Sequence, residues 1–406
     1  MNMDKKVPEI RFKGFSGEWL NNPIGTICGT TFGGGTPSTS EKSFWQGDIP
    51  WIQSSDLQNN SISSVNAKKY ITKEAINKSA AKLVSGNSIA IVTRVGVGKL
   101  SLMEDEYATS QDFLSLSDLK ADPQYSAYAL WIQLQIEKEQ VQGTSIKGIT
   151  KNELLSKTIN YPEIKSEQTA IGSYFKKLDS LINQHQQKHD KLSNIKKAMI
   201  EKMFPKQGEA VPEIRFKGFS GEWEEKSVSQ LGEIITGSTP STQNLANYSN
   251  DGIPWVTPTD ISRNVTFNTA KRLSLVGCKV ARIVPKNTIL VTCIASIGKN
   301  TILGSQGSFN QQINGVVPNE KENNPYFLYS ASVLWSEKLK RSASSGTMQI
   351  VNKTEFSELK NRVPKKEEQI AIGNYFQKLD VLINQHQQQI TKLNNIKQAC
   401  LSKMFV

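Results

Sequence analysis

The sequence has few of the residues that build metal and disulfide sites. It contains 4 cysteines and 3 histidines among 406 residues. The cysteines are scattered at Cys28, Cys278, Cys293 and Cys400, and none forms a C-x-x-C pair. This pattern supports neither a disulfide framework nor a zinc site. We expect reduced, mostly buried thiols and no metal ion.

Long apolar runs are also missing. No stretch approaches the roughly 18 residues that a membrane-spanning helix needs. The charged start, Met1 to Lys6, is not followed by the apolar core of a signal peptide. Hydrophobic residues make up 37% and charged residues 21% of the chain, which is typical of a folded domain rather than of a disordered segment. We therefore expect a cytoplasmic protein without a membrane partner.

Sequence signals of catalysis are incomplete. Asn323 to Tyr326 is similar to the Asn-Pro-Pro-Tyr element of adenine methyltransferases, but the first proline and the preceding apolar strand are missing. Phe32 to Thr36 lacks the second glycine of a methyl-donor loop. Neither Gly-Lys pair, ending at Lys99 and at Lys299, has the earlier glycine of a phosphate-binding loop. Since no nucleophile–base set can be assembled either, we predict a chain without an active site.

Positive charge is in excess in both halves of the chain. There are 49 basic and 37 acidic residues, which gives a net charge of +12. Residues 1–207 hold 26 basic against 21 acidic residues, and residues 208–406 hold 23 against 16. A spread positive charge favours a polyanionic partner, either nucleic acid or an anionic membrane surface. The chain is also too long for one hydrophobic core, so at least two domains are expected.

The sequence contains an internal tandem repeat of two copies. Val7 to Trp19 recurs without a change as Val211 to Trp223, and Gln168 to Phe204 aligns with Gln369 to Phe405 at about two-thirds identity. The segments between these anchors have diverged, over residues 58–140 and 262–345. One scaffold that carries two different interiors would suit the recognition of two different features in one geometry.

Residues 166–204 and their repeat are predicted to be long helices. They are rich in Lys, Gln, Leu and Ile, and the first has no proline or glycine after Gly172. A helix of about 38 residues is roughly 57 Å long. Its single heptad seam needs a partner, and the obvious partner is its own repeat. His185 and His189 share one face, but Ile390 replaces the second histidine in the repeat, which favours a polar layer over a metal pair. The predicted seam comprises Phe175, Leu178, Ile182, His185, Leu192, Phe376, Leu379, Ile383, His386 and Leu393.

Each variable segment is predicted to fold as a mixed domain of about 150 residues. Apolar, β-branched runs predict strands at Ser88 to Val95 and at Thr288 to Ile294. Helices are expected at Ser126 to Glu139 and at Pro325 to Lys340. Trp51 and Trp255 each follow an Ile-Pro pair and are interpreted as structural anchors rather than stacking platforms.

Polar and basic side chains gather at the turns of both variable domains. Such side chains on rigid loops can recognise base edges, and hydroxyl groups suit phosphates. The same residue types also form ordinary turns. As a paired set on a basic protein, they favour DNA contact. The candidates are Thr36, Ser38, Ser54, Ser55, Lys68, Lys69, Arg94, Lys99, Gln111, Thr144, Ser145, Lys147, Thr239, Ser241, Thr257, Thr259, Arg263, Lys299, Asn310, Gln311, Gln312, Thr347 and Gln349.

Over its whole length the chain resembles the specificity subunit of type I restriction-modification enzymes. The resemblance is carried by the duplicated Pro-Glu-Ile-Arg-Phe opening, the Thr-Pro-Ser turn, the Ile-Pro-Trp step, the Gly-Thr loop and the helix starts at 167–182 and 368–383. It implies an α+β fold with two mixed α/β target recognition domains in a pseudo-twofold tandem repeat, separated by an antiparallel coiled coil of two long conserved helices. The implied segments are recognition domains at 1–160 and 208–363, a central helix and linker at 161–207, and a C-terminal helix at 364–406.

The resemblance also implies a function. Each domain would recognise one half of a bipartite, asymmetric site in double-stranded DNA, while the helices would set the spacer and dock two modification (methyltransferase) subunits. A restriction-translocase subunit would complete the enzyme, and S-adenosylmethionine, ATP and magnesium would belong to these partners. The non-catalytic role has two alternatives: a stand-alone DNA methyltransferase or nuclease, and a coiled-coil scaffold that binds DNA without sequence preference. Because Ser110 to Asp112 faces the unlike Asn310 to Gln312 in the repeat, contacts are not transferable between domains there.

Overall fold

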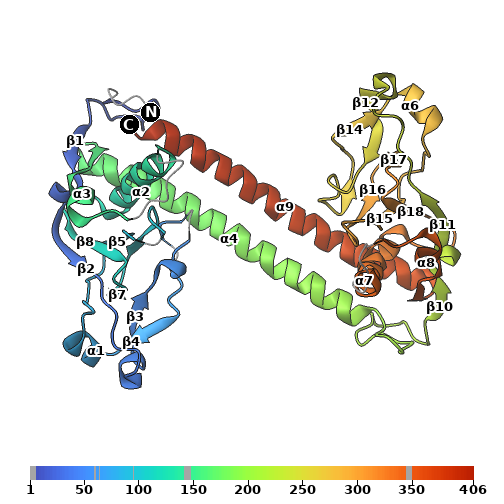
Figure 1. Ribbon diagram of the computed structural model, residues 1–406, viewed down its shortest axis with the longest axis horizontal. Helices are drawn as coiled ribbons and strands as arrows, with labels where there is room; N and C mark the ends of the chain where they lie inside the picture. The colour runs from blue at the N-terminus through green and yellow to red at the C-terminus, as the bar shows by residue number, and fades with distance from the viewer. Residues whose placement is uncertain (1–5, 59–60, 64, 95, 141–147, 344–349) are drawn as a thin grey trace. The chain divides into compact units, whose positions relative to one another are not determined.

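The chain forms two compact units. The computed structural model describes residues 6–58, 61–63, 65–94, 96–140, 148–343 and 350–406. The first unit comprises residues 1–185 and 388–406, and the second comprises residues 186–387. Each unit joins one variable domain to a stretch of both long helices, α4 (Lys165–Met203) and α9 (Lys366–Met404) (Figure 1). Among the helices of the described residues, none is long and apolar enough to span a bilayer.

The described part of the first unit contains three sheets, ordered β2-β8-β5-β6, β4-β3-β7 and β1-β9. Helix α2 packs on β5 and β6, and the small β4-β3-β7 sheet with α1 lies at the end of the unit away from α2 (Figure 1). The elements are β1 (Leu20–Pro23), β2 (Cys28–Gly33), β3 (Ile49–Ile52), β4 (Lys69–Ile71), α1 (Lys73–Lys78), β5 (Ser88–Val92), β6 (Leu100–Met103), β7 (Ala108–Thr109), β8 (Phe113–Leu119), α2 (Pro123–Gln140), α3 (Lys151–Ser156) and β9 (Thr158–Tyr161).

The second unit repeats this plan. Its described residues form sheets ordered β11-β18-β15-β16-β13, β14-β12-β17 and β10-β19, with α7 packed on β15 and β16. The elements are β10 (Glu224–Ser227), α5 (Val228–Leu231), β11 (Gly232–Thr236), β12 (Tyr248–Val256), β13 (Val265–Thr266), β14 (Lys271–Leu273), α6 (Leu275–Val280), β15 (Ile289–Thr292), β16 (Asn300–Leu303), β17 (Ser308–Phe309), β18 (Ile313–Pro318), α7 (Pro325–Ala343), α8 (Lys353–Glu358) and β19 (Lys360–Val363). The predicted strands and helices are present, with ends displaced by a few residues.

Helices α2 and α7 begin for the same local reason. Asp122 and Asn324 precede them, and each accepts a hydrogen bond from a backbone amide in the first turn, at Tyr125 and Phe327, both at 2.9 Å. A proline follows each cap, where a missing amide hydrogen costs nothing. Asn324 is therefore a helix cap, which explains the partial likeness to a methyltransferase element without any catalytic role.

Within each unit, α4 and α9 run antiparallel. In the first unit, Tyr174 lies beside Cys400 while Asp179 lies beside Lys397, so the numbering rises along one helix as it falls along the other. In the second unit, Lys196 contacts Asp380, and Phe204 lies 6.2 Å from Phe376 between ring centroids. The long helices predicted from the repeat are thus confirmed, and they pair within each unit as expected.

The end of each long helix completes the core of a variable domain. Phe405, at the end of α9, stacks on Tyr125 at 5.4 Å and meets Trp19 edge-on at 6.3 Å. Phe204, at the end of α4, makes the corresponding contacts with Phe327 and Trp223. Both phenylalanines are buried. Each tryptophan of the repeated openings therefore packs in a core that includes a phenylalanine from the other copy of the repeat.

The repeated Pro-Glu-Ile-Arg-Phe opening is an anchor on the long helices. Arg11 forms a bidentate ion pair with the buried Glu167, from Nε to Oε1 at 2.6 Å and from Nη2 to Oε2 at 2.7 Å. Its Nη1 atom donates to the Gly17 carbonyl at 2.6 Å. Arg215 repeats the arrangement on Glu368, which is also buried. Paired geometry of this kind is favourable for an arginine and a carboxylate. The opening thus has a structural role, which accounts for its unchanged repetition.

Candidate nucleic-acid interface

The Thr-Pro-Ser turn of the first unit is held rigidly by two tryptophans. It follows β2, and Trp51 is almost fully buried beneath it. The indole N–H of Trp51 donates to the Gly35 carbonyl at 2.9 Å, and that of Trp45 donates to the Ser38 carbonyl at 3.0 Å. The two indoles meet edge-on with centroids 5.0 Å apart. Trp51 is therefore the anchor that the sequence predicted.

The second unit holds its turn by one equivalent bond and one shifted bond. Trp255 donates its indole N–H to the Ser238 carbonyl at 3.0 Å. Tyr248 takes the place of the second tryptophan, because its hydroxyl donates to the Pro240 carbonyl at 2.8 Å and its ring packs edge-on against Trp255. The turns thus keep their shape while neighbouring side chains differ.

A threonine of each turn forms a hydrogen bond with a glutamine from a later segment of the same unit. The Thr36 hydroxyl donates to the Oε1 atom of Gln111 at 2.8 Å, and Thr239 makes the same bond to Gln311. Both glutamines are exposed although a strand-rich segment separates each from its threonine. With Oε1 held by the threonine, the amide nitrogen is presented as a donor on a fixed loop. This is the kind of group that recognises a base edge in the major groove.

Each glutamine should affect recognition in its own domain. We expect Gln111→Ala to weaken binding to one half of the bipartite DNA site that the resemblance implies by roughly tenfold or more, since a good glutamine–base contact contributes about 1–3 kcal/mol. Gln311→Ala should do the same to the other half-site, so each variant is the matched control for the other. Binding is measured with duplexes in which one half-site is scrambled at a time. Equal losses on both halves, or no loss in either variant, would contradict the role.

The next pair of turns is stabilised internally. Asp56 accepts a hydrogen bond from the Gln53 amide at 2.9 Å, and Asp260 accepts from the amide and hydroxyl of Thr257 at 2.8 and 2.6 Å. Ser55 and Thr259 remain exposed beside them, and Ser54 is half-buried. The hydroxyls of Thr257 and Thr259, 2.8 Å apart, therefore bond within the turn, whereas Ser55 is exposed.

Lys99 and Lys299 contact these turns and stabilise them by hydrogen bonds to backbone carbonyls. The ammonium of Lys99 donates to the carbonyls of Ser54 and Leu57, both at 3.2 Å, and that of Lys299 donates to the Pro258 carbonyl at 3.0 Å. Backbone carbonyls hold these cations, so the lysines position the turn rather than extend toward a phosphate. Their paired occurrence in the sequence has a structural explanation.

The small sheet of the first unit carries an aromatic and basic cavity. The Lys69 ammonium lies 5.4 Å from the Trp45 ring centroid and 5.5 Å from that of Trp51, in cation–π geometry. A cavity of about 460 Å³ is lined by Thr39, Trp45, Gly47, Lys68, Lys69 and Tyr70. In the second unit Lys271 lies 5.4 Å from the Tyr248 ring. Trp45, Tyr70 and Lys271 were not among the sequence candidates. The position of Tyr70 directly after Lys68 and Lys69 could have indicated this cavity.

The other candidates have mixed surroundings. Asn310 is buried, and its side-chain N–H donates to the Oε1 atom of Gln312 at 2.9 Å. The backbone N–H of Gln312 donates to the Oδ1 atom of Asn310 at 3.1 Å, so the two residues bind each other. The candidates Ser38, Lys68, Arg94, Ser241 and Arg263 are exposed. Five candidates lie outside the described residues: Thr144, Ser145, Lys147, Thr347 and Gln349.

The predicted helix seam is more buried at its ends than toward its middle. Phe175, Leu178, Phe376 and Leu379 are buried. The remaining members are half-buried, namely Ile182, His185, Leu192, Ile383, His386 and Leu393. Apolar contacts are therefore strongest where the helices enter the domain cores.

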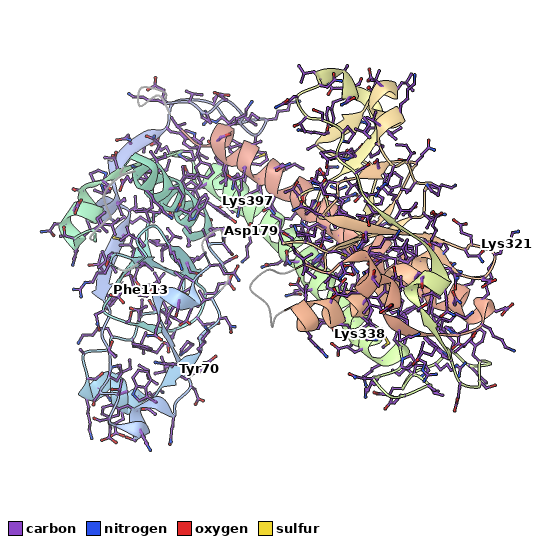
Figure 2. All side chains as sticks on the ribbon, turned by 45° about the vertical axis from the view of Figure 1, so that its right-hand side comes forward. Tyr70, Phe113, Asp179, Lys321, Lys338 and Lys397 are labelled. Carbon is purple, nitrogen blue, oxygen red and sulfur yellow. The ribbon has the colours of Figure 1, made fainter. Side chains whose placement is uncertain are left out.

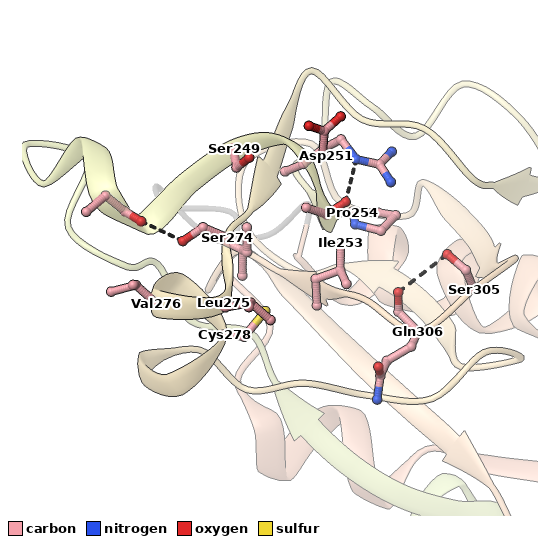
Figure 3. Close-up of a pocket in the computed structure, with 14 residues that line it drawn as sticks. Ser249, Asp251, Ile253, Pro254, Ser274, Leu275, Val276, Cys278, Ser305 and Gln306 are labelled. Atoms are coloured by element: carbon pink, nitrogen blue, oxygen red, sulfur yellow. Dashed lines mark hydrogen bonds between the residues drawn. The ribbon is translucent and has the colours of Figure 1, made fainter.

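An open cavity in the second unit offers no catalytic arrangement. It has a volume of about 750 Å³ beside β12 and α6 (Figure 3). Its polar groups serve the backbone: Ser274 donates to the Ala246 carbonyl and Arg272 to the Gly252 carbonyl. Burial raises the pKa of the Cys278 thiol, which keeps it protonated and a poor nucleophile. Across the described residues, no three His, Cys, Asp or Glu side chains are grouped to hold a metal ion.

Comparison with known proteins identifies the family. A family model for the type I restriction modification DNA specificity domain matches residues 17–194 and again residues 220–395. The chain belongs to this family. The membership predicted from the duplicated motifs is thus confirmed, and the two matches coincide with the two copies of the repeat.

Relatives and a solved structure agree with this membership. The chain is 33% identical over 150 residues to the type I restriction enzyme HindI specificity subunit of Haemophilus influenzae, and 29% identical over 197 residues to the MjaIX specificity subunit of Methanocaldococcus jannaschii. These alignments cover 36% and 46% of this chain, but only 32% and 44% of the relatives, so less than half of their length is spanned. The fold resembles that of a type I restriction-modification S subunit from M. genitalium, with a TM-score of 0.66 and 15% identity over 98% of this chain and 99% of the other. This likeness confirms the predicted fold class.

Proposed function

We propose that the chain is the DNA-specificity subunit of a type I restriction-modification complex. Each variable domain recognises one half of a bipartite, asymmetric site, and the long helices set the distance between the halves. The observation that carries the proposal is the repeated turn: an equivalent tryptophan–carbonyl bond and an equivalent threonine–glutamine bond present Gln111 in one unit and Gln311 in the other, amid unlike neighbours. Two recognition surfaces on one framework are what an asymmetric site requires.

The partners follow from this role. We propose that the subunit binds double-stranded DNA and two modification subunits, and that a restriction-translocase subunit joins the complete complex in the cytoplasm. S-adenosylmethionine, ATP and magnesium would be bound by those partners. The twofold repeat of the helix faces supports two equal docking sites, since a repeated surface suits two copies of one partner.

A methyl-transfer assay separates the proposal from a stand-alone enzyme. Purified chain with labelled S-adenosylmethionine and DNA should show no transfer. Addition of the modification subunits should give transfer confined to a bipartite site. Turnover by the chain alone would overturn the non-catalytic role. Equal affinity for unrelated duplexes, with the salt dependence of phosphate contacts only, would instead favour a non-specific scaffold.

A further inference from the structure

We propose that two aspartate–lysine–tyrosine clusters, each built on a buried aspartate, fix the register of α4 against α9 and thereby the permitted spacer length. The inference rests on the proposed function, because a spacer has meaning only for a bipartite site. We call the clusters the first clasp and the second clasp. Their members are Asp179, Lys397 and Tyr128 in the first unit, and Asp380, Lys196 and Tyr326 in the second.

The first clasp joins three helices in a largely buried position. The Lys397 ammonium on α9 lies 2.6 Å from Oδ1 of Asp179 on α4, and Figure 2 shows the two side by side. The Tyr128 hydroxyl on α2 donates to Oδ2 of Asp179 at 2.6 Å. Asp179 is 7% and Lys397 5% exposed. Burial raises the pKa of Tyr128, so its hydroxyl remains a donor. Both oxygens of the carboxylate are thus occupied by partners on other helices.

The second clasp is the same construction with the helices exchanged. Asp380 now comes from α9 and is 2% exposed, while Lys196 from α4 lies 2.6 Å from its Oδ1 atom. The Tyr326 hydroxyl on α7 donates to Oδ2 at 2.6 Å. The repeat therefore places one ion pair of the same kind in each unit, with opposite helices supplying the acid.

The tyrosines reach these carboxylates from different positions of equivalent helices. Helices α2 and α7 begin at Pro123 and Pro325, so Tyr128 is the sixth residue of its helix and Tyr326 the second. The position of Tyr326 is taken by Gln124 in α2, and that of Tyr128 by Ser330 in α7. The two tyrosines thus differ by four residues, about one helical turn, in their positions along equivalent helices. The cluster's chemistry is retained although its third residue has moved, which indicates a need for the complete cluster.

The half-buried part of the heptad seam between the two domain cores would by itself tolerate slippage of one helix along the other, although the burial of Phe405 and Phe204 in those cores opposes it. A slip by one heptad moves the helices by roughly 10 Å and keeps apolar positions in layers. In the slipped registers, Asp179 would face Ile390 or Met404 in place of Lys397, and Asp380 would face His189 or Met203. A buried carboxylate without its cation is strongly disfavoured, and fixing register is a well-attested use of buried polar groups. The clasps thus act together with the core contacts of Phe405 and Phe204 to exclude the slipped registers.

The test replaces both clasps by apolar residues of similar volume. The variant carries Tyr128→Phe, Asp179→Leu and Lys397→Met together with Tyr326→Phe, Asp380→Leu and Lys196→Met. It is assembled with the modification subunits, and methylated sites are mapped by long-read sequencing. We expect additional methylated sites whose spacer differs by up to about three base pairs, at 3.4 Å per base pair. The control removes the exposed pair Glu104–Lys176 by Glu104→Gln and Lys176→Met, and should keep one spacer.

The outcomes separate this inference from the proposed function. A folded variant that methylates only the original spacer would overturn the register role. Should the six replacements prevent folding, Asp179→Asn with Asp380→Asn preserves side-chain shape, and a single spacer in that variant would overturn the role equally. If the unaltered chain supports no bipartite methylation, the proposed function itself fails.

Discussion

Exchange of the first variable domain is expected to change one half of the recognised site and to leave the other half and the spacer unaltered. The domain is framed by β1 and β9, which pair from Leu20↔Tyr161 to Pro23↔Thr158. Residues 24–157 can therefore be replaced by the corresponding part of another family member while the paired strands remain, and the graft keeps Tyr128 so that the first clasp stays complete. The core of the first unit is separate from that of the second, so the unaltered domain keeps its own packing.

The reciprocal exchange is the matched control. In the second unit β10 pairs with β19 from Glu224↔Val363 to Ser227↔Lys360, so residues 228–359 define the graft, in which Tyr326 is kept so that the second clasp stays complete. This exchange should alter only the other half-site. Both exchanges are assayed by mapping methylated DNA in cells that contain the modification subunits. A change in both halves after a single exchange would show that the domains do not recognise DNA independently.

Lengthening both long helices by one heptad is expected to lengthen the spacer and preserve both half-sites. Seven residues add roughly 10 Å to a helix, which corresponds to at most about three base pairs. Insertion after Gln187 and after Gln388 falls within two residues of the boundary between the units and leaves both clasps intact, because Asp179 with Lys397 and Asp380 with Lys196 each lie within one unit.

Insertion in only one helix provides the contrast. It would displace one member of a clasp from its partner, so we expect loss of methylation or a mixture of spacers rather than one new length. Melting temperatures of the two insertion variants distinguish loss of folding from loss of register. An unaltered spacer in the doubly lengthened chain would contradict the role of the helices as a spacer.

Local features of the sequence predicted the helices and strands well, because their causes are local. The absence of proline and glycine after Gly172 predicted α4 to within about two residues of each end, and apolar β-branched runs predicted β5 and β15. The start of α2 was predicted three residues late, at Ser126, because the Asp122–Pro123 pair was not recognised as a cap followed by proline.

The remaining features depend on contacts between distant parts of the chain. Nothing in the sequence near Phe405 indicates that it packs on Trp19, or that Thr36 bonds Gln111. Lys99 was a reasonable DNA candidate as a repeated cation, yet two backbone carbonyls hold it. Composition shows which groups are available, but only the fold decides which of them the protein itself uses.

The most direct test of the account is a methylation map of cells that express this chain with its modification subunits, compared with cells that lack the chain. We predict methylation at one bipartite motif with two unlike halves and a fixed spacer, present only with the chain. Methylation at a continuous motif, or an identical map in both cells, would contradict the claim that two unlike domains on paired helices recognise DNA together.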